Sequence, residues 1–180
     1  MLDDAIPLTA ILLCQLLPLA LGAAILVAAA LHDVAARTIP NWTCIALAIL
    51  GLLLRWADGQ LIAGVLLGLT VFAAAAFCWR RGWLGGGDVK LLAAAAVFVP
   101  PHGVGNMLCD TALAGGLVAL VYLVSRRLLR NDAEAPMAAR RALPKRLRIF
   151  HAERRRLRRG GPLPYGSAIA CGTIFVLITG

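Results

Sequence analysis

Long apolar runs alternate with short polar breaks along this chain. The first run, Leu8 to Leu31, holds 24 residues without a charge, and a helix needs about 20 apolar residues to cross a bilayer. Five more runs follow: Trp42 to Trp56, Leu61 to Trp79, Leu91 to Val99, Met107 to Ser125, and the stretch from Pro164-Tyr165-Gly166 to Gly180. The pattern predicts an all-α, polytopic integral membrane protein with about six transmembrane helices in one domain, residues 1–180.

Proline and glycine mark the ends of these runs. Pro40 disfavours helical geometry at Ile39 and can itself open the next helix. Pro100-Pro101-His102-Gly103 closes the fourth run, which is unusually short. A helix from Asp88 to Val99 would rise only about 18 Å. We therefore expect this helix to be tilted inward, or the bilayer to be thinner beside it.

Composition strengthens the membrane assignment. Of 180 residues, 61% are hydrophobic and only 15% are charged, which is far more apolar sequence than a soluble domain of this size needs. The net charge of +9 comes mostly from one loop, residues 126–162. Phe150 is the only aromatic residue in that loop, so a nucleic-acid surface is not expected. Contact with anionic lipid is the expected role of its charge.

The basic residues also predict the orientation. With six crossings, all 18 Lys and Arg residues except Arg55 fall on one side of the membrane. Basic loops face the cytoplasm, so loop 126–162 is predicted to be cytoplasmic and both termini to lie on the outer side.

No metal or cofactor site is expected. The five cysteines are spread one to each apolar run apart from the fourth, without a CxxC pair or a histidine at ligand spacing. We therefore expect these cysteines to be small, buried hydrophobic residues. No Ser-His-Asp triad and no HExxH, Walker or Rossmann pattern is present.

Two carboxylates are the candidate chemistry. Asp33 ends the first predicted helix, and Asp88 follows three glycines at the start of the fourth. Two complete crossings separate them, so both lie at the cytoplasmic face. Such a pair can share a proton, with one member activating water while the other polarises a carbonyl. It could also bind a divalent cation, relay protons in a small transporter or channel subunit, or merely pair with Arg37 and Lys90.

The two motifs together resemble a known family. The segment from Asp33 through Arg37 and Ile39-Pro40-Asn41, followed by Gly85-x-Gly87-Asp88-x-Lys90, is similar to the type IV prepilin peptidases, membrane aspartic proteases of the GxGD kind. The six-helix pattern and Pro164-Tyr165-Gly166 extend the resemblance over most of the chain.

The resemblance implies that Asp33 and Asp88 are the catalytic pair. It implies a prepilin or pseudopilin substrate, cut in the bacterial inner membrane at its cytoplasmic face, between a short basic leader and a hydrophobic helix. The small size points to the Tad/Flp-type branch. Larger members carry a cytoplasmic region with paired cysteines that is linked to N-methylation; this chain has no such region before Asp33, so methyltransferase activity is not expected.

Six further residues have supporting roles in this interpretation. Gly85 and Gly87 would let an extended substrate approach Asp88. Arg37 and Lys90 would orient or charge-balance the pair, or equally anchor their helices at the headgroups. Pro40 and Asn41 are expected to shape the turn into the second helix without taking part in chemistry.

Overall fold

The computed structural model describes residues 8–128 and 163–179. Within these residues it contains six α-helices, one 3₁₀ turn and no strand. The helices are α1 (Leu8–Ala36), α2 (Asn41–Ala57), α3 (Leu61–Arg80), α4 (Gly86–Phe98), α5 (Val104–Leu128) and α8 (Tyr165–Thr179), and the turn η1 covers Pro101–Gly103. The all-α prediction is confirmed.

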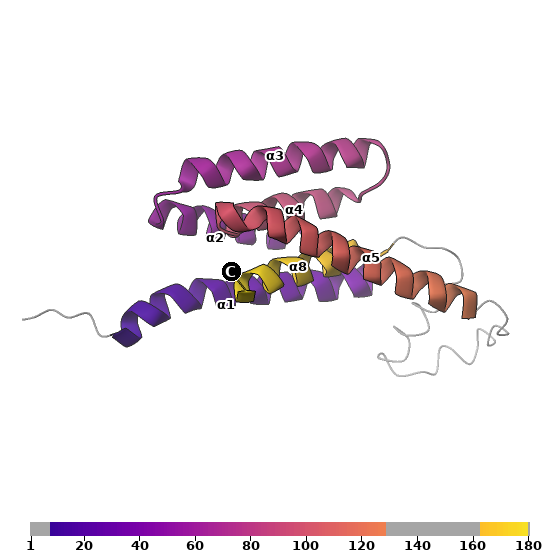
Figure 1. Ribbon diagram of the computed structural model, residues 1–180, viewed down its shortest axis with the longest axis horizontal. Coiled ribbons are helices and arrows are strands. Elements are labelled where there is room, and N and C mark those ends of the chain that lie inside the picture. The colour runs from indigo at the N-terminus through magenta and orange to yellow at the C-terminus, as the bar shows by residue number, and fades with distance from the viewer. Residues whose placement is uncertain (1–7, 129–162, 180) are drawn as a thin grey trace, which may run out of the picture.

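The helices run alternately back and forth along the long axis of the molecule (Figure 1). α1, α3 and α5 run in one direction, and α2, α4 and α8 return in the other. The last turn of α1 therefore lies at the same end of the bundle as the first turns of α4 and α8. We call this end the carboxylate end, because it contains Asp33 and Asp88.

The short helix α4 is the centre of the packing. It packs against α2, α3 and α8, and seven of its 13 residues are buried. Small and β-branched side chains make this possible: Ala94, Ala95 and Ala96 are all buried, as is Val89, so neighbouring helices can approach closely. At about 1.5 Å per residue, α4 rises about 20 Å, so it is shorter than a bilayer core but enclosed largely by protein.

Phe98 fixes the far end of α4. Its side chain is fully buried, and it lies against two glycines. A Cβ atom on Gly22 of α1 would be 2.1 Å from the Phe98 ring, and one on Gly51 of α2 would be 2.7 Å from the Phe98 backbone. Only glycine fits at these positions, so the sequence keeps both neighbouring helices close to α4.

Gly64 and Gly68 of α3 likewise lie at helix contacts. A Cβ on Gly68 would be 2.3 Å from Cγ2 of Val97 in α4, and one on Gly64 would be 2.7 Å from Cγ of Arg55 in α2. These two glycines therefore let α3 pack closely against α4 and α2 of the same chain.

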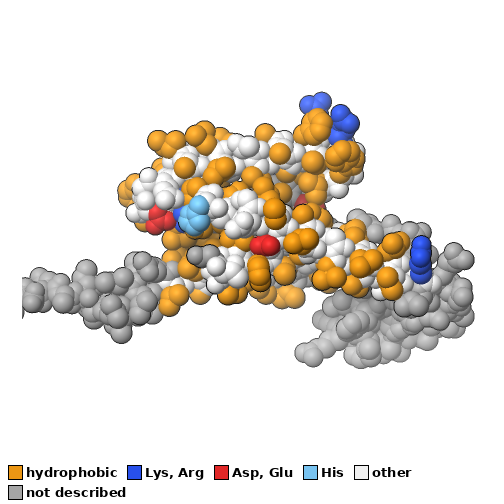
Figure 2. All heavy atoms as spheres, viewed as in Figure 1, with side chains coloured by type: hydrophobic (Ala, Val, Ile, Leu, Met, Phe, Trp, Pro, Cys, Tyr) orange, Lys and Arg blue, Asp and Glu red, His pale blue; other side chains and the backbone are white. Residues whose placement is uncertain are grey.

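The outside of the bundle is apolar, as expected for a multi-pass membrane protein. Hydrophobic side chains are spread over the visible face (Figure 2). The large hydrophobic residues with exposed side chains include Ile62, at 76%, and Leu113, at 73%. Three stretches in the described residues are long and apolar enough to cross a membrane: Leu16–Ala36, Leu61–Arg80 and Pro101–Ser125. α2 and α8 are apolar but shorter. Six crossings and the outward position of the termini remain predictions.

Several helix boundaries differ from the sequence prediction. α1 continues to Ala36 rather than stopping at Leu31, α4 begins at Gly86 rather than Asp88, and α5 covers Val104–Leu128 rather than Met107 to Ser125. Backbone hydrogen bonding carries a helix into polar residues beyond its apolar run, so hydropathy underestimates its length. α5 thus includes positions 126–128 of the predicted basic loop, and the rest of it, 129–162, lies outside the described residues.

Candidate active site

Asp33 lies in the last turn of α1 and is buried, with only 5% of its surface exposed. Its Oδ2 atom accepts a hydrogen bond of 2.9 Å from the backbone N–H of Gly166. Gly166 is in the first turn of α8, where N–H groups have no partner within the helix. This bond and the N-terminal end of the helix dipole both favour negative charge on Asp33.

Asp88 lies in the first turn of α4 and is partly buried. Its Oδ2 accepts a hydrogen bond of 3.2 Å from the N–H of Gly85, the residue that precedes the helix. A side chain at the third helical position commonly reaches back to this N–H group. A Cβ on Gly85 would lie 2.8 Å from the same oxygen, so any other residue there would push the Asp88 carboxyl group from its position.

The two carboxyl groups are close enough to interact. Burial, and secondly repulsion from Asp33, raise the pKa of Asp88 to about 6, although the Gly85 N–H bond acts in the opposite direction. Asp88 precedes the apolar part of α4 and lies outside the three candidate spans. Below about pH 6 the pair can therefore hold one proton between two carboxyl groups, with Asp88 as the group that retains it.

Ile39 connects the two carboxylate motifs. A Cβ on Gly87 would lie 3.1 Å from Cβ of Ile39, and a Cβ on Gly166 would lie 3.0 Å from Cδ1 of the same residue. Ile39 thus fills the space that two glycines leave, one beside each aspartate. Gly87 has a role in packing here, in addition to the predicted approach of a substrate.

Pro40 and Asn41 lie at the start of α2. Pro40 precedes the helix in extended geometry, and its carbonyl accepts bonds from both the N–H and the hydroxyl of Thr43. The Asn41 Oδ1 atom accepts a hydrogen bond of 3.0 Å from Nζ of Lys90. Since Lys90 is two residues after Asp88, this bond links the N-terminal part of α4 to the first turn of α2.

Arg37 is directed to a different helix. Its guanidinium donates a hydrogen bond to the hydroxyl of Tyr122 in α5 and lies 5.4 Å from the centre of that ring. Its backbone has a φ of 57°, a left-handed conformation that ends α1 and is uncommon for a residue with a side chain. Arg37 therefore links the α1–α2 turn to α5; its expected roles in orienting or charge-balancing the pair, or in anchoring at the headgroups, stay predictions.

The carboxylate end thus brings together Asp33, Asp88, Gly85, Gly87 and the Ile39-Pro40-Asn41 segment. Sequence reasoning missed two contributors: the Gly166 N–H group and the Tyr122 hydroxyl. Pro164-Tyr165-Gly166 was singled out as a motif, and its glycine directly before an apolar run was the available signal. Nothing in the sequence pattern marked Tyr122. Among the described residues, no three His, Cys, Asp or Glu side chains cluster as metal ligands do.

Residues 20–124 match the model of the type IV leader peptidase family. Searches of curated proteins and of solved structures give no match. The matched region contains both aspartates and all six supporting residues, and it covers more than half of the chain. α8 and its Gly166 lie beyond it. The chain belongs to the type IV leader peptidase family.

Proposed function

We propose that this protein is an aspartic endopeptidase of the membrane that removes the short basic leader from prepilins or pseudopilins. Asp33 and Asp88 activate the attacking water. The observation that carries the proposal is the meeting of two carboxyl groups from distant helices, α1 and α4, at one end of the bundle, where the charge of one acts on the other.

The environments of the two carboxyl groups suggest which one acts as the base and which as the acid. Asp33 acts as the base, because a backbone N–H and a helix N-terminus favour its charged form. It takes a proton from water as the water oxygen attacks the scissile carbonyl carbon. Asp88 holds the shared proton and donates it to the carbonyl oxygen. Proton transfer to the amide nitrogen then breaks the C–N bond and releases a new carboxyl and a new amine.

Charge supports a cytoplasmic position for this end. Arg37, Arg80, Arg81 and Lys90 all lie at or next to the carboxylate end (Figure 1), and basic residues favour the cytoplasmic side. Arg55 lies at the opposite end of α2, where its guanidinium pairs with Asp58 at 3.0 Å. The protein would then act in the bacterial inner membrane on a substrate whose leader is cytoplasmic. A Tad/Flp-type pilin, processed without methylation, is the substrate that the small size favours.

Single and double replacements of the aspartates test the proposal. Asp33→Asn and Asp88→Asn preserve shape but remove the ionisable group, so cleavage of prepilin in proteoliposomes should fall to background in each. The double variant should be no worse, because groups that act as a unit do not contribute additively.

Asp58→Asn is the matched control, since it makes the same chemical change in a half-exposed carboxylate at the opposite end. It should cleave like the wild type. Membrane insertion and thermal stability of all variants are compared by gel-filtration and melting curves. Near-normal cleavage by a folded Asp33→Asn or Asp88→Asn protein would refute the aspartic mechanism and favour a transport function for the pair.

A further inference from the structure

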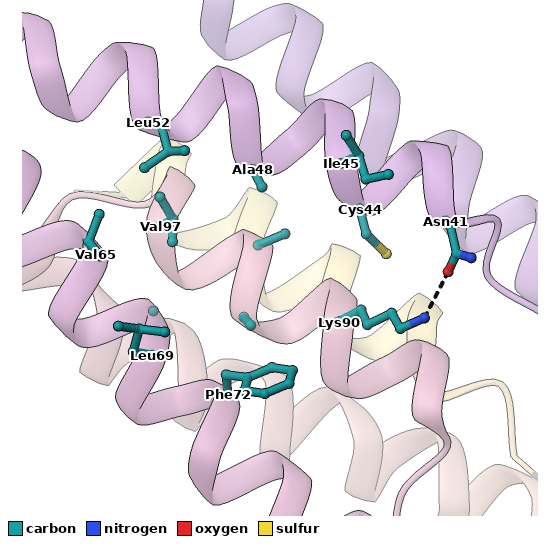
Figure 3. A pocket seen from close by; sticks show the side chains of 13 residues that line it. Asn41, Cys44, Ile45, Ala48, Leu52, Val65, Leu69, Phe72, Lys90 and Val97 are labelled. Atoms are coloured by element: carbon teal, nitrogen blue, oxygen red, sulfur yellow. Dashed lines mark hydrogen bonds between the residues drawn. The ribbon is translucent and has the colours of Figure 1, made fainter.

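An apolar groove begins beside the carboxylate end and runs along the bundle. It has a volume of about 640 Å³ and opens to the outside of the protein between α2 and α3, with α4 as its floor. α4 packs against both of these helices, whereas α2 and α3 contact each other much less. Figure 3 shows the lining side chains pointing into the space between the three helices.

Each of the three helices lines the groove with one straight stripe of residues. α2 contributes positions 41, 44, 45, 48 and 52, α3 contributes 65, 68, 69 and 72, and α4 contributes 90, 93, 94 and 97. Every stripe follows the i, i+3, i+4, i+7 spacing of one helix face. The stripes on α2 and α3 lie on either side of the stripe on α4. Three adjacent helix faces of this kind form a surface against which a further helix of a bundle can pack.

The size of the groove suits a helix. The stripe on α2 spans 11 residue steps, or about 17 Å, which is three helical turns. A cylinder of that length and about 10 Å in diameter has a volume of about 1,300 Å³, so the groove would hold on the order of half of it. Ala48, Gly68, Ala93 and Ala94 keep the lining shallow, and small residues of this kind allow close helix contact in membranes.

The groove begins near the candidate active site, although neither aspartate is among its lining residues. Its polar end is the Lys90–Asn41 pair, bonded at 3.0 Å (Figure 3), and Asp88 is two residues before Lys90. Cys44, on the groove wall, lies within electrostatic range of both Lys90 and Asp88. The polar end of the groove is therefore the end that lies nearer to the carboxylates. The ammonium of Lys90 has two more N–H donors for carbonyl groups at this entrance.

We propose that this groove binds the first three turns of the substrate's hydrophobic helix, directly after the scissile bond. The inference rests on the proposed function, and it adds where the substrate is held. The helix lies between α2 and α3 on α4, and its N-terminal end is at Lys90 and Asn41. The groove runs from the carboxylate end toward the opposite side of the membrane, which is the direction a helix takes when its leader is cytoplasmic.

A bulky residue in the groove tests the proposal. Ala48→Phe fills the middle of the α2 stripe, so kcat/KM for full-length prepilin in proteoliposomes should fall at least about tenfold. A peptide that contains the leader and the cleavage site but lacks the hydrophobic helix should be affected much less. Equal loss for both substrates, or no loss for either, would overturn the proposal.

Ala74→Phe is the matched control. Ala74 is an exposed residue of α3 outside the groove lining, and it lies on the face opposite the α3 stripe. The same change in size there should leave the preference for full-length prepilin intact. An equal loss of preference in this variant would mean that helix packing in general is responsible.

Cross-linking provides a second test that does not depend on activity. A photoreactive phenylalanine replaces Phe72 or Ile45, both partly exposed in the groove, in the Asp88→Asn protein. Irradiation with prepilin should join each site to the hydrophobic helix of the substrate, and the same probe at Ala74 should not. Adducts with lipid alone would assign the groove to acyl chains and overturn the proposal. Cleavage by the wild type tests the proposed function separately.

Discussion

Replacing Gly166 by alanine should damage catalysis without unfolding the protein. The new Cβ atom would lie 3.0 Å from Oδ2 of Asp33, 3.2 Å from its Cβ and 3.0 Å from Cδ1 of Ile39. These distances are shorter than ordinary van der Waals contact, so the Asp33 carboxylate must move by a few tenths of an ångström. Its 2.9 Å hydrogen bond from the Gly166 N–H would then be lengthened or lost.

The size of the effect follows from that bond. A hydrogen bond to a charged group contributes about 1.5–3 kcal/mol, and about 1.36 kcal/mol corresponds to a tenfold change in rate. The bond holds the Asp33 carboxylate in position to take the proton from water, so its loss should lower kcat roughly 10- to 150-fold. A shift of a few tenths of an ångström stays within the about 0.5 Å that catalytic groups tolerate, so the lost hydrogen bond is expected to decide the size of the effect. The assay is prepilin cleavage in proteoliposomes over a range of substrate concentrations.

Two other glycines separate this effect from general packing. A Cβ on Gly116 of α5 would meet no atom within 4 Å, so Gly116→Ala should leave kcat unchanged and stabilise the helix by about 0.5–1 kcal/mol. A Cβ on Gly172 of α8 would lie 2.5 Å from the backbone nitrogen of Thr111. Gly172→Ala should therefore lower the melting temperature while the folded fraction keeps its kcat. Wild-type kcat in Gly166→Ala would refute the role of this N–H group.

Three further predictions concern pH, packing and topology. Burial and Asp33 raise the pKa of Asp88 to about 6, so Asp88 is protonated below that pH. Because Asp88 acts as the acid, kcat should fall about tenfold per pH unit above pH 6. A kcat that still increases between pH 6 and 8 would contradict the assigned roles. In Gly51→Ala the new Cβ would lie 2.7 Å from the Phe98 backbone, so thermal unfolding should show a loss of stability of about 1–3 kcal/mol. In Gly105→Ala the new Cβ would have no atom within 4 Å, so this variant should not lose stability. Cysteine labelling should find residues 57–60 on the outer side and 129–162 in the cytoplasm, and the reverse result would remove the basis for a cytoplasmic site.

Much of the fold could be predicted because its causes are local. Hydropathy marks a helix wherever apolar residues continue for several turns, and Pro40 and the glycines before Asp88 mark where helices must end or begin. The number of runs between Asp33 and Asp88 was enough to predict that both lie at one end. The short fourth run was also recognised, but hydropathy alone could not explain how so short a helix is accommodated. The structure gives the reason: α4 is enclosed by α2, α3 and α8.

The sequence by itself determined the class of protein and the family, and it predicts the two aspartates as the site, since each depends on residue type and spacing along one stretch of chain. Only the tertiary structure decided what surrounds those aspartates. The bond from Gly166 to Asp33 joins residues 133 positions apart, and Ile39 packs beside Gly87 and Gly166 only because three helix ends meet there. The groove likewise exists because α4 holds α2 and α3 apart. Such contacts depend on how whole helices pack, and no local pattern of residues specifies that packing.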